Sequence, residues 1–312
     1  ASANGYDVIL NELSPAASFI ESNFLKYVDP QDYQAGIQFV LNKTKKVRDT
    51  LYTTTCRECS TKTEILYVVW SYELECNHCN GVFVLWDHCR KYGSNVKEHK
   101  LLKKFDCPHC LKEVNKSYLN RLDTKPVFLG YKCCSKQIKE HSLDVSDYEN
   151  IKKSEDLVQN YQGIYPDVEI PDGVNLNQPK RHGIKNIKDF YTARNLVACS
   201  SIWQAIGLVA DKEIASLLTF TFTSLYQRVT KTSEYRFWGG SSNTANFNIP
   251  QIFNEANVYL TFERKSKNIL DHLKSTAQKY TGKSVIHTGS ATNLSFLPDE
   301  SVDLIFTDPP FG

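Results

Sequence analysis

Apolar and polar residues alternate along the chain in two kinds of block, which together predict a mixed α/β protein. Short apolar runs bounded by turn residues are typical of strands, whereas longer runs with apolar residues three or four positions apart are typical of helices. The runs with strand character are residues 6–13, 65–70, 127–131, 284–291 and 302–306. The runs with helical character are residues 15–27, 30–52, 189–209, 211–228 and 257–280. Ser14 followed by Pro15 marks the start of the first helix, because proline is favoured at the first helical position.

Two segments between these blocks show neither pattern. Residues 145–179 are charged and rich in turn dipeptides such as Pro166-Asp167, so we interpret them as a connector. Residues 228–253 mix Ser, Asn and Gly with aromatic residues, including Phe237 and Trp238. A long polar segment of this kind is either a binding loop or disordered.

Length and composition narrow the class of protein. The 312 residues are enough for two or three domains, and the net charge of +2 means that any nucleic-acid surface is a local patch. No apolar run approaches the roughly 20 residues needed to cross a bilayer, and no charged and apolar leader opens the chain, so we expect a cytoplasmic protein without membrane contact. The chain has no methionine and its most distinctive motif falls on its last residues, so we interpret it as a piece of a longer protein.

The strongest metal signal is a pair of Cys-x-x-Cys knuckles. Cys56 and Cys59 are followed, after a spacer of hairpin size, by Cys76 and Cys79. Four thiolates with this spacing suit a tetrahedral Zn²⁺ site. Disulfides or redox chemistry are the alternatives, but in an intracellular chain such knuckles more often bind metal. We therefore predict one zinc ion held by these four cysteines.

A second, less regular group of cysteines predicts a second zinc ion. Cys107, Cys110 and Cys133 have the spacing of a zinc ribbon, although a regular second knuckle would place a cysteine where the chain has Lys136. Cys199 lies in an apolar helical stretch and is interpreted as a buried hydrophobic residue. The candidates for the fourth ligand are Cys134, Cys89, His88, His109 and His141.

The end of the chain combines an apolar run with groups that suit a planar substrate bearing an exocyclic amine. After residues 302–306, which resemble a buried strand, come Asp308, Pro309, Pro310 and Phe311. Asp308 and the carbonyl of Pro309 could each accept a hydrogen bond from the amine, while Phe311 stacks on the ring. In open α/β sheets, ligands bind at the carboxyl ends of strands. The alternative is an ordinary proline-containing turn.

The run from Ser301 to Phe311, preceded by the strand and turn at 284–291, resembles the catalytic region of amino-group DNA methyltransferases. That family uses S-adenosylmethionine to methylate N6 of adenine or N4 of cytosine, and the form with Asp favours adenine. The order of residues 11–15, the two cysteine groups, residues 178–181 and residues 190–196 is similar to that in bacterial zinc-ribbon-containing adenine-specific DNA methyltransferases. The resemblance implies direct methyl transfer to a flipped base. It implies the catalytic residues Asp308, Pro309, Pro310 and Phe311.

The resemblance also implies a fold: part of a class I S-adenosylmethionine-dependent methyltransferase (Rossmann-like) sheet with a large inserted zinc-ribbon and helical region. The implied divisions are a cofactor-side segment (1–52), a zinc-ribbon insertion with one or two zinc sites (53–143), a connector and helical DNA-recognition region (144–256), and a return helix with the catalytic strands (257–312). The family's first strand, with its glycine-rich turn, is not found in the sequence, so we expect these 312 residues alone to be inactive.

Two residues are candidates for binding S-adenosylmethionine. Glu12 ends the first strand, and an acid at such a position hydrogen-bonds ribose hydroxyls in dinucleotide folds. In the resembled family the matching acid holds the ribose of the cofactor. The alternative is that Glu12 only adds favourable negative charge near a helix start. Ser290 stands where the family usually has an acid beside the cofactor's adenine.

A basic and aromatic segment is the candidate nucleic-acid surface. Residues 180–194 contain five cations and two aromatic residues, a mixture that suits phosphate contacts combined with stacking. The alternative is a solvated helix entry. The residues proposed to contact DNA are Lys180, Arg181, Lys185 and Arg194.

The main function hypothesis is therefore a DNA adenine methyltransferase with zinc and S-adenosylmethionine as cofactors, acting in restriction-modification or genome defence. Its expected partners are DNA and a further subunit of such a system. Three alternatives stay open: an RNA amino-methyltransferase, a zinc module that binds nucleic acid without catalysis, and a scaffold for a partner subunit.

Overall fold

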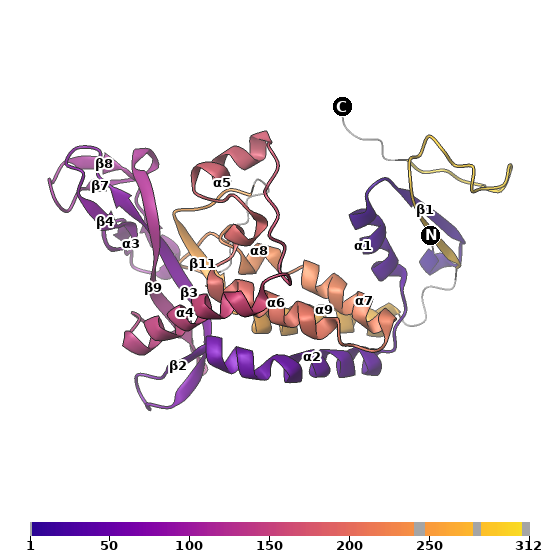
Figure 1. Cartoon of the computed structure of the whole chain (residues 1–312), viewed down its shortest axis with the longest axis horizontal. Coiled ribbons are helices and arrows are strands. Elements are labelled where there is room, and N and C mark those ends of the chain that lie inside the picture. Colours follow the sequence, from indigo (N-terminus) through magenta and orange to yellow (C-terminus); the bar gives the residue numbers. More distant parts are fainter. Residues whose placement is uncertain (1, 240–246, 277–281, 308–312) are drawn as a thin grey trace. The chain divides into compact units, whose positions relative to one another are not determined.

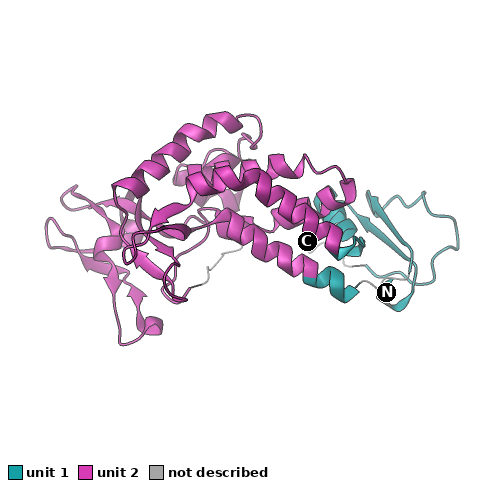
Figure 2. Cartoon of the chain, turned by 90° about the horizontal axis from the view of Figure 1, so that it is seen from below, with its two compact units in different colours: residues 1–30, 271–312 teal, residues 31–270 magenta. Residues whose placement is uncertain are grey.

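The structure is a computed structural model that describes residues 2–239, 247–276 and 282–307. The chain divides into two compact units (Figure 2). The smaller unit is made of residues 1–30 and 271–312, and the larger unit is made of residues 31–270. Each unit is described by itself below.

The smaller unit is built on two parallel strands that are far apart in the sequence. Strand β1 (Val8–Glu12) pairs with β12 (Ser284–Thr288), from Val8 opposite Ser284 to Glu12 opposite Thr288 (Figure 1). Helix α1 (Pro15–Leu25) follows β1 and packs on both strands. It begins at Pro15, as predicted. A short 3₁₀ helix, η1 (Ser2–Asn4), precedes β1.

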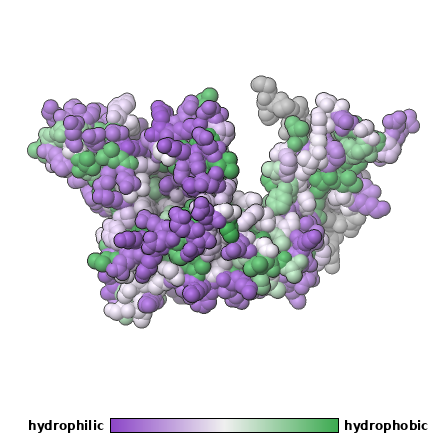
Figure 3. Space-filling model, viewed as in Figure 1, coloured by the Kyte–Doolittle hydropathy of each residue, from purple (hydrophilic) through white to green (hydrophobic). Residues whose placement is uncertain are grey.

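Apolar side chains remain on the surface of the smaller unit, where they appear in green in Figure 3. Ile9 and its register partner Val285 are both exposed, because one helix covers only one face of a two-stranded sheet.

The strand predicted at residues 302–306 is not found, so this prediction was wrong. These residues form neither helix nor strand, and Leu304 and Phe306 are 85% and 92% exposed. An apolar run becomes a buried strand only beside a pairing neighbour, and among the described residues it has none.

The larger unit is organised around two long antiparallel strands, β3 (Lys62–Glu75) and β9 (Asn120–Tyr131). Strand β10 (Lys139–His141) pairs with β9, and β11 (Ile252–Ala256) pairs with the other edge of β3. Strands β2 (Thr53–Thr55) and β4 (Val82–Val84) fold back on the two ends of β3. The protein is therefore mixed α/β with a mostly antiparallel sheet, and the predicted strands at 65–70 and 127–131 are confirmed within β3 and β9. Two small hairpins are separate from this sheet: β5 (Arg90–Lys91) with β6 (Lys100–Leu101), and β7 (Lys104–Asp106) with β8 (Glu113–Asn115).

Helices account for much of the rest of the larger unit. The predicted helices at 30–52, 189–209 and 211–228 are found with shorter bounds or in pieces. The helix predicted at 257–280 is found as far as Thr276, and residues 277–280 lie outside the described residues. The α-helices are α2 (Pro30–Leu51), α3 (Leu85–His88), α4 (Val145–Val158), α5 (Asn177–Arg181), α6 (Ala193–Ile206), α7 (Lys212–Thr223), α8 (Tyr226–Val229) and α9 (Val258–Thr276). The 3₁₀ helices are η2 (Val96–Glu98), η3 (Lys116–Tyr118), η4 (Gln159–Tyr161), η5 (Val174–Leu176) and η6 (Ile187–Phe190).

Helix α4 corrects the prediction that residues 145–179 are only a connector. Its start is fixed by a capping box, in which the side chains of Asp144 and Asp147 each accept a hydrogen bond from the other's backbone amide. Asp147 is buried and also accepts a hydrogen bond of 2.7 Å from Thr54, while Ile151 is buried on the same helix. The helix was missed because its charged residues mask a narrow buried face.

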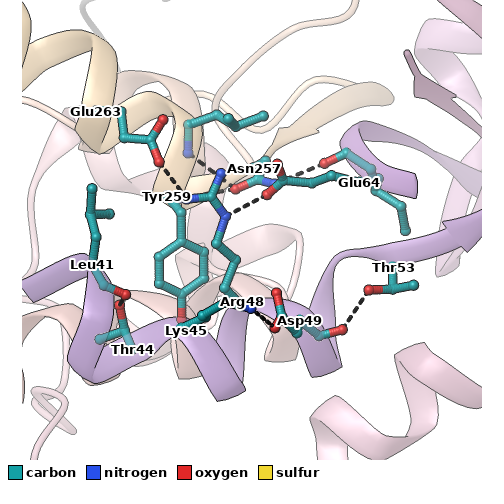
Figure 4. A network of polar contacts seen from close by, with 12 residues as sticks. Leu41, Thr44, Lys45, Arg48, Asp49, Thr53, Glu64, Asn257, Tyr259 and Glu263 are labelled. Carbon is teal, nitrogen blue, oxygen red and sulfur yellow. Dashed lines mark hydrogen bonds and ion pairs between the residues drawn. The ribbon is translucent and has the colours of Figure 1, made fainter. Parts of the chain in front are cut away.

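The two units divide at 30 and 271, whereas the sequence placed the divisions at 52 and 257. The difference arises because α2 and α9 are bound to the larger unit by polar contacts. The hydroxyl of Tyr33 on α2 lies 2.7 Å from that of Thr221 on α7. Arg48, near the end of α2, binds Glu64 on β3 at 2.7 Å and also Glu263 on α9 (Figure 4).

Candidate metal centres

Eight cysteines gather into two groups of four that could each hold a metal ion such as zinc. The first cluster is Cys56, Cys59, Cys133 and Cys134, and the second cluster is Cys76, Cys79, Cys107 and Cys110. Within each cluster all four sulfur atoms lie within 4.8 Å of one another. All of these cysteines are free thiols in the structure. Four cysteines converging on one point are the donor set of a structural Zn²⁺ site.

Three of the four cysteine pairs share one local fold. In each of these three turns, the backbone carbonyl of the first cysteine accepts a hydrogen bond from the amide of the residue that follows the second cysteine. The first cysteines are Cys56, Cys76 and Cys107. Those following residues have left-handed backbone conformations, with φ values of 55° at Ser60, 57° at Asn80 and 61° at Leu111. The left-handed residue reverses the chain directly after the second cysteine. Both thiols of a pair therefore face the same point, which is why a Cys-x-x-Cys spacing can be recognised from sequence.

The second cluster joins two hairpins that each carry such a turn. One turn links β3 to β4, and the other links β7 to β8. The Sγ atoms of Cys76 and Cys110 are 3.9 Å apart, and those of Cys79 and Cys107 are 3.8 Å apart. Tetrahedral zinc with bonds of about 2.3 Å would separate neighbouring sulfurs by about 3.8 Å. The second cluster thus has the spacing of a zinc ribbon.

The first cluster combines the turn between β2 and β3 with two adjacent cysteines just after β9. The Sγ atoms of Cys56 and Cys134 are 3.5 Å apart, and those of Cys59 and Cys133 are 3.4 Å apart. Thr61 adds a hydroxyl 3.0 Å from the sulfur of Cys59. The chain bends at residues 133–137, and this bend lets neighbouring cysteines reach the same point, as they could not in a regular strand.

The predicted pairing of the knuckles was wrong. Cys56 and Cys59 precede β3 and Cys76 and Cys79 follow it, so a strand of 14 residues separates them. At about 3.3 Å per residue, this strand spans roughly 45 Å and so keeps the two knuckles far apart. The antiparallel return of β9 instead brings Cys133 and Cys134 to the first knuckle.

Of the five candidates for the missing ligand, Cys134 joins a cluster and the other four do not. The Nε2 atom of His109 lies 3.0 Å from the carbonyl oxygen of Val82, and the Nδ1 atom of His141 lies 2.7 Å from that of Ser142. His88 packs edge-on against Phe83. Cys89 is buried, and this burial raises the pKa of its thiol to about 11.

Because the thiols of the first cluster lie close together, their pKa values differ widely. Hydrogen bonds from Cys134 and Thr61 lower the pKa of Cys59 to about 6, so its thiolate forms near neutral pH. The hydrogen bonds with Cys59 and Cys56 raise the pKa of Cys134 to about 12. Thiols that hydrogen-bond to one another in this way suit a metal cation, because the cation can take the place of their protons. Cys199 contrasts with this group, because burial alone raises its pKa to about 12, as expected for a core residue.

The candidate cofactor residues lie at one edge of the smaller unit. Glu12 is half-buried at the carboxyl end of β1, and its carbonyl accepts a hydrogen bond of 2.9 Å from Gly289 just after β12. Ser290 is exposed and its hydroxyl lies 2.8 Å from that of Thr292. The predicted catalytic residues Asp308, Pro309, Pro310 and Phe311 lie outside the described residues.

Two further polar residues at this edge were not singled out from the sequence. The Oδ1 atom of Asn11 lies 2.7 Å from Nδ1 of His287, and its Nδ2 donates to the carbonyl of Gly289 at 3.2 Å. His287 in turn stacks on Phe296, with ring centroids 4.0 Å apart. The parallel pairing of β1 with β12 brings these side chains together, and no spacing in the sequence signals it.

The four predicted nucleic-acid contacts do not form one surface. The prediction that Arg194 contacts nucleic acid was wrong. Its side chain is 2% exposed and forms an ion pair with Glu255 on β11, which is 1% exposed. An arginine neutralised in the core cannot reach a phosphate. Lys180 pairs with Asp172 at 2.5 Å, whereas Arg181 and Lys185 are exposed.

Comparisons with protein-family models, with curated proteins and with solved structures found no match to this chain. None of the described helices is long and apolar enough to cross a membrane.

Proposed function

We propose that this chain belongs to an S-adenosylmethionine-dependent methyltransferase that modifies an exocyclic amine of a base in DNA, with N6 of adenine as the favoured target. The observation that carries the proposal is the parallel pair of β1 and β12, with Glu12 and Ser290 at its carboxyl edge. Ligands of open α/β sheets bind at this edge. The Asp308 motif follows β12 in the chain, and its sequence suits the amine of a planar base.

The surroundings of Glu12 fit the cofactor's hydroxyl and amino groups. The carboxylate of Glu12 has no hydrogen-bond partner among the described residues. One carboxylate oxygen of Glu21, on α1, is buried and also without a partner in that part of the chain. Burial and the nearby charge of Glu12 raise the pKa of Glu21. Two carboxylates that lack donors match a ligand that brings several donors.

In the proposed mechanism the cofactor supplies an electrophilic methyl group. Glu12 would accept hydrogen bonds from the ribose hydroxyls and so orient the cofactor. Asp308 and the carbonyl of Pro309 would accept hydrogen bonds from the amine of the base, which would favour attack by its nitrogen, and Asp308 would take the proton that this nitrogen loses. Phe311 would stack on the ring. The two cysteine clusters, when loaded with zinc, would stabilise the larger unit in a folded form that binds DNA.

The test is transfer of a labelled methyl group from S-adenosylmethionine to DNA by the full-length protein. Asp308→Ala should abolish transfer and leave most of the cofactor affinity, since its carboxylate contacts the amine. Asp299→Ala is the matched control, because it removes an exposed acid just before the run from Ser301 to Phe311.

An Asp308→Ala variant that still methylates DNA would overturn the assignment. Transfer into RNA but not DNA would select the RNA methyltransferase instead. Binding of nucleic acid without cofactor binding or transfer would select a non-catalytic zinc module.

A further inference from the structure

A cavity of about 990 Å³ in the larger unit is lined by arginines and aromatic rings and belongs to neither cysteine cluster. Its walls come from β3, the β5–β6 hairpin, the segment 235–239 and α9. Part of the polar segment 228–253, predicted from sequence as a binding loop or disorder, therefore contributes directly to this cavity. The cavity residues used below are Arg90, Arg228, Arg236, Arg264, Tyr92, Phe237 and Trp238.

The arginines of the cavity carry positive charge that the protein does not neutralise. In the described part of the chain, no carboxylate lies within ion-pair distance of Arg90, Arg228 or Arg264, and Arg236 reaches Glu234 only at 3.9 Å. Burial and the like charge of Arg228 lower the pKa of Arg264. Arg48, which lies outside the cavity, contrasts with these arginines because it binds two glutamates. Uncompensated cations in a concave site attract anions.

Flat rings lie directly beside these cations. The guanidinium of Arg90 lies 5.7 Å from the centre of the Tyr92 ring, and that of Arg236 lies 5.8 Å from the centre of the Trp238 ring. Tyr92 and Trp238 are each more than half exposed, so each ring keeps surface that a ligand can reach beside its arginine. Phe237 supports Tyr92 from the side, with ring centroids 5.8 Å apart.

The one glutamate that lines the cavity is already engaged. Glu140 accepts a hydrogen bond from the hydroxyl of Tyr67 across β3 and β10. It keeps its negative charge, but a single carboxylate offsets only one of the four arginines that line the cavity. A ligand that carries both negative charge and planar apolar surface would use the two features together. A simple anion would leave the rings unused, and an uncharged aromatic ligand would leave the arginines unused.

We propose that this cavity binds a single-stranded segment of nucleic acid, with phosphates at the arginines and bases stacked on Tyr92 and Trp238. Proteins that hold single strands combine a cationic groove with aromatic platforms in this way. The proposal concerns strand binding and needs no cofactor, so it can fail or hold independently of the methyltransferase assignment. The segment 180–194 is not part of this cavity.

The test measures binding of a fluorescent single-stranded oligodeoxynucleotide to the full protein by anisotropy, without S-adenosylmethionine, at several salt concentrations. Arg228→Gln with Arg264→Gln should weaken binding at least ~10-fold and lower the slope of log affinity against log salt by about 1.4, that is 0.7 for each lost phosphate contact. Lys152→Gln with Lys153→Gln is the control. It removes the same charge from exposed residues of α4, which does not line the cavity, and should change affinity little.

Stacking is tested separately from charge. Trp238→Ala should weaken binding of the single strand ~5-fold or more, and Trp238→Phe should largely restore it, because a flat ring is retained. Both variants should keep the melting temperature of the parent, since Trp238 is exposed. The proposal is overturned if the arginine pair and the lysine pair weaken binding equally, or if neither does. It is also overturned if inorganic polyphosphate binds as well as the oligonucleotide and Trp238→Ala changes nothing.

Discussion

Replacing Cys59 and Cys79 together by Ser should remove both metal ions from the protein, because these thiols belong to different clusters. Replacing Cys59 and Cys134 together should remove only one ion, because these thiols belong to the same cluster. The pairing inferred from sequence spacing predicts another result. In that pairing Cys59 and Cys79 share one ion, so the first variant would keep the other.

The size of the stability change follows from the loop that each cluster closes. Cys59 and Cys133 are 74 positions apart, and Cys79 and Cys107 are 28 positions apart. With the loop-closure relation used for cross-links, these loops correspond to about 4.4 and about 3.6 kcal/mol of restricted unfolded-state entropy at 25 °C. A change of 1 kcal/mol moves the melting temperature of a unit of this size by roughly 2–4 °C. Loss of the first cluster should therefore lower the melting temperature by roughly 9–18 °C.

The assay is elemental analysis of dialysed protein together with calorimetry. The parent and a Cys89→Ala control should hold two zinc ions, because Cys89 is buried but lies in neither cluster. The Cys59→Ser/Cys134→Ser variant should hold one, and the Cys59→Ser/Cys79→Ser variant none. Retention of one ion by the latter variant would refute the pairing seen in the structure. Unchanged melting temperatures on zinc removal would refute its structural role.

Three further predictions test single residues. In metal-stripped protein, alkylation of Cys59 should increase as the pH rises through about 6, because its pKa is lowered to that value and the thiolate is the reactive form. Cys199 is buried with a pKa of about 12, so mass spectra should show it unmodified. Arg194→Ala should destabilise the protein by about 3–5 kcal/mol in denaturant titrations, because it leaves Glu255 buried and unpaired; the salt dependence of DNA binding should not change, and a reduced salt slope would contradict this. In the full-length protein, Glu12→Gln should raise the dissociation constant of S-adenosylmethionine ~10-fold by calorimetry, as expected for one charge-assisted hydrogen bond, and an unchanged constant would remove Glu12 from the site.

Features set by neighbouring residues could be predicted from the sequence alone. The knuckle turns depend on a few consecutive residues, so their positions, and their suitability as candidate metal ligands, could be predicted from the Cys-x-x-Cys spacing. The start of α1 at Pro15 and the length of α2 are of the same kind, because caps and helical periodicity are local. The long strands β3 and β9 were partly visible as apolar runs.

Features set by distant residues were decided only by the tertiary structure. Which cysteines come together depends on the antiparallel pairing of β3 with β9, which brings Cys59 to Cys133 rather than to Cys79. Whether a cation faces solvent depends on what packs against it, and Glu255, 61 residues away, draws Arg194 into the core. The apolar run at 302–306 is exposed because a strand gains its burial from neighbours. The chain's own pattern specifies which surfaces need a partner, and only the folded arrangement specifies which partner each one meets.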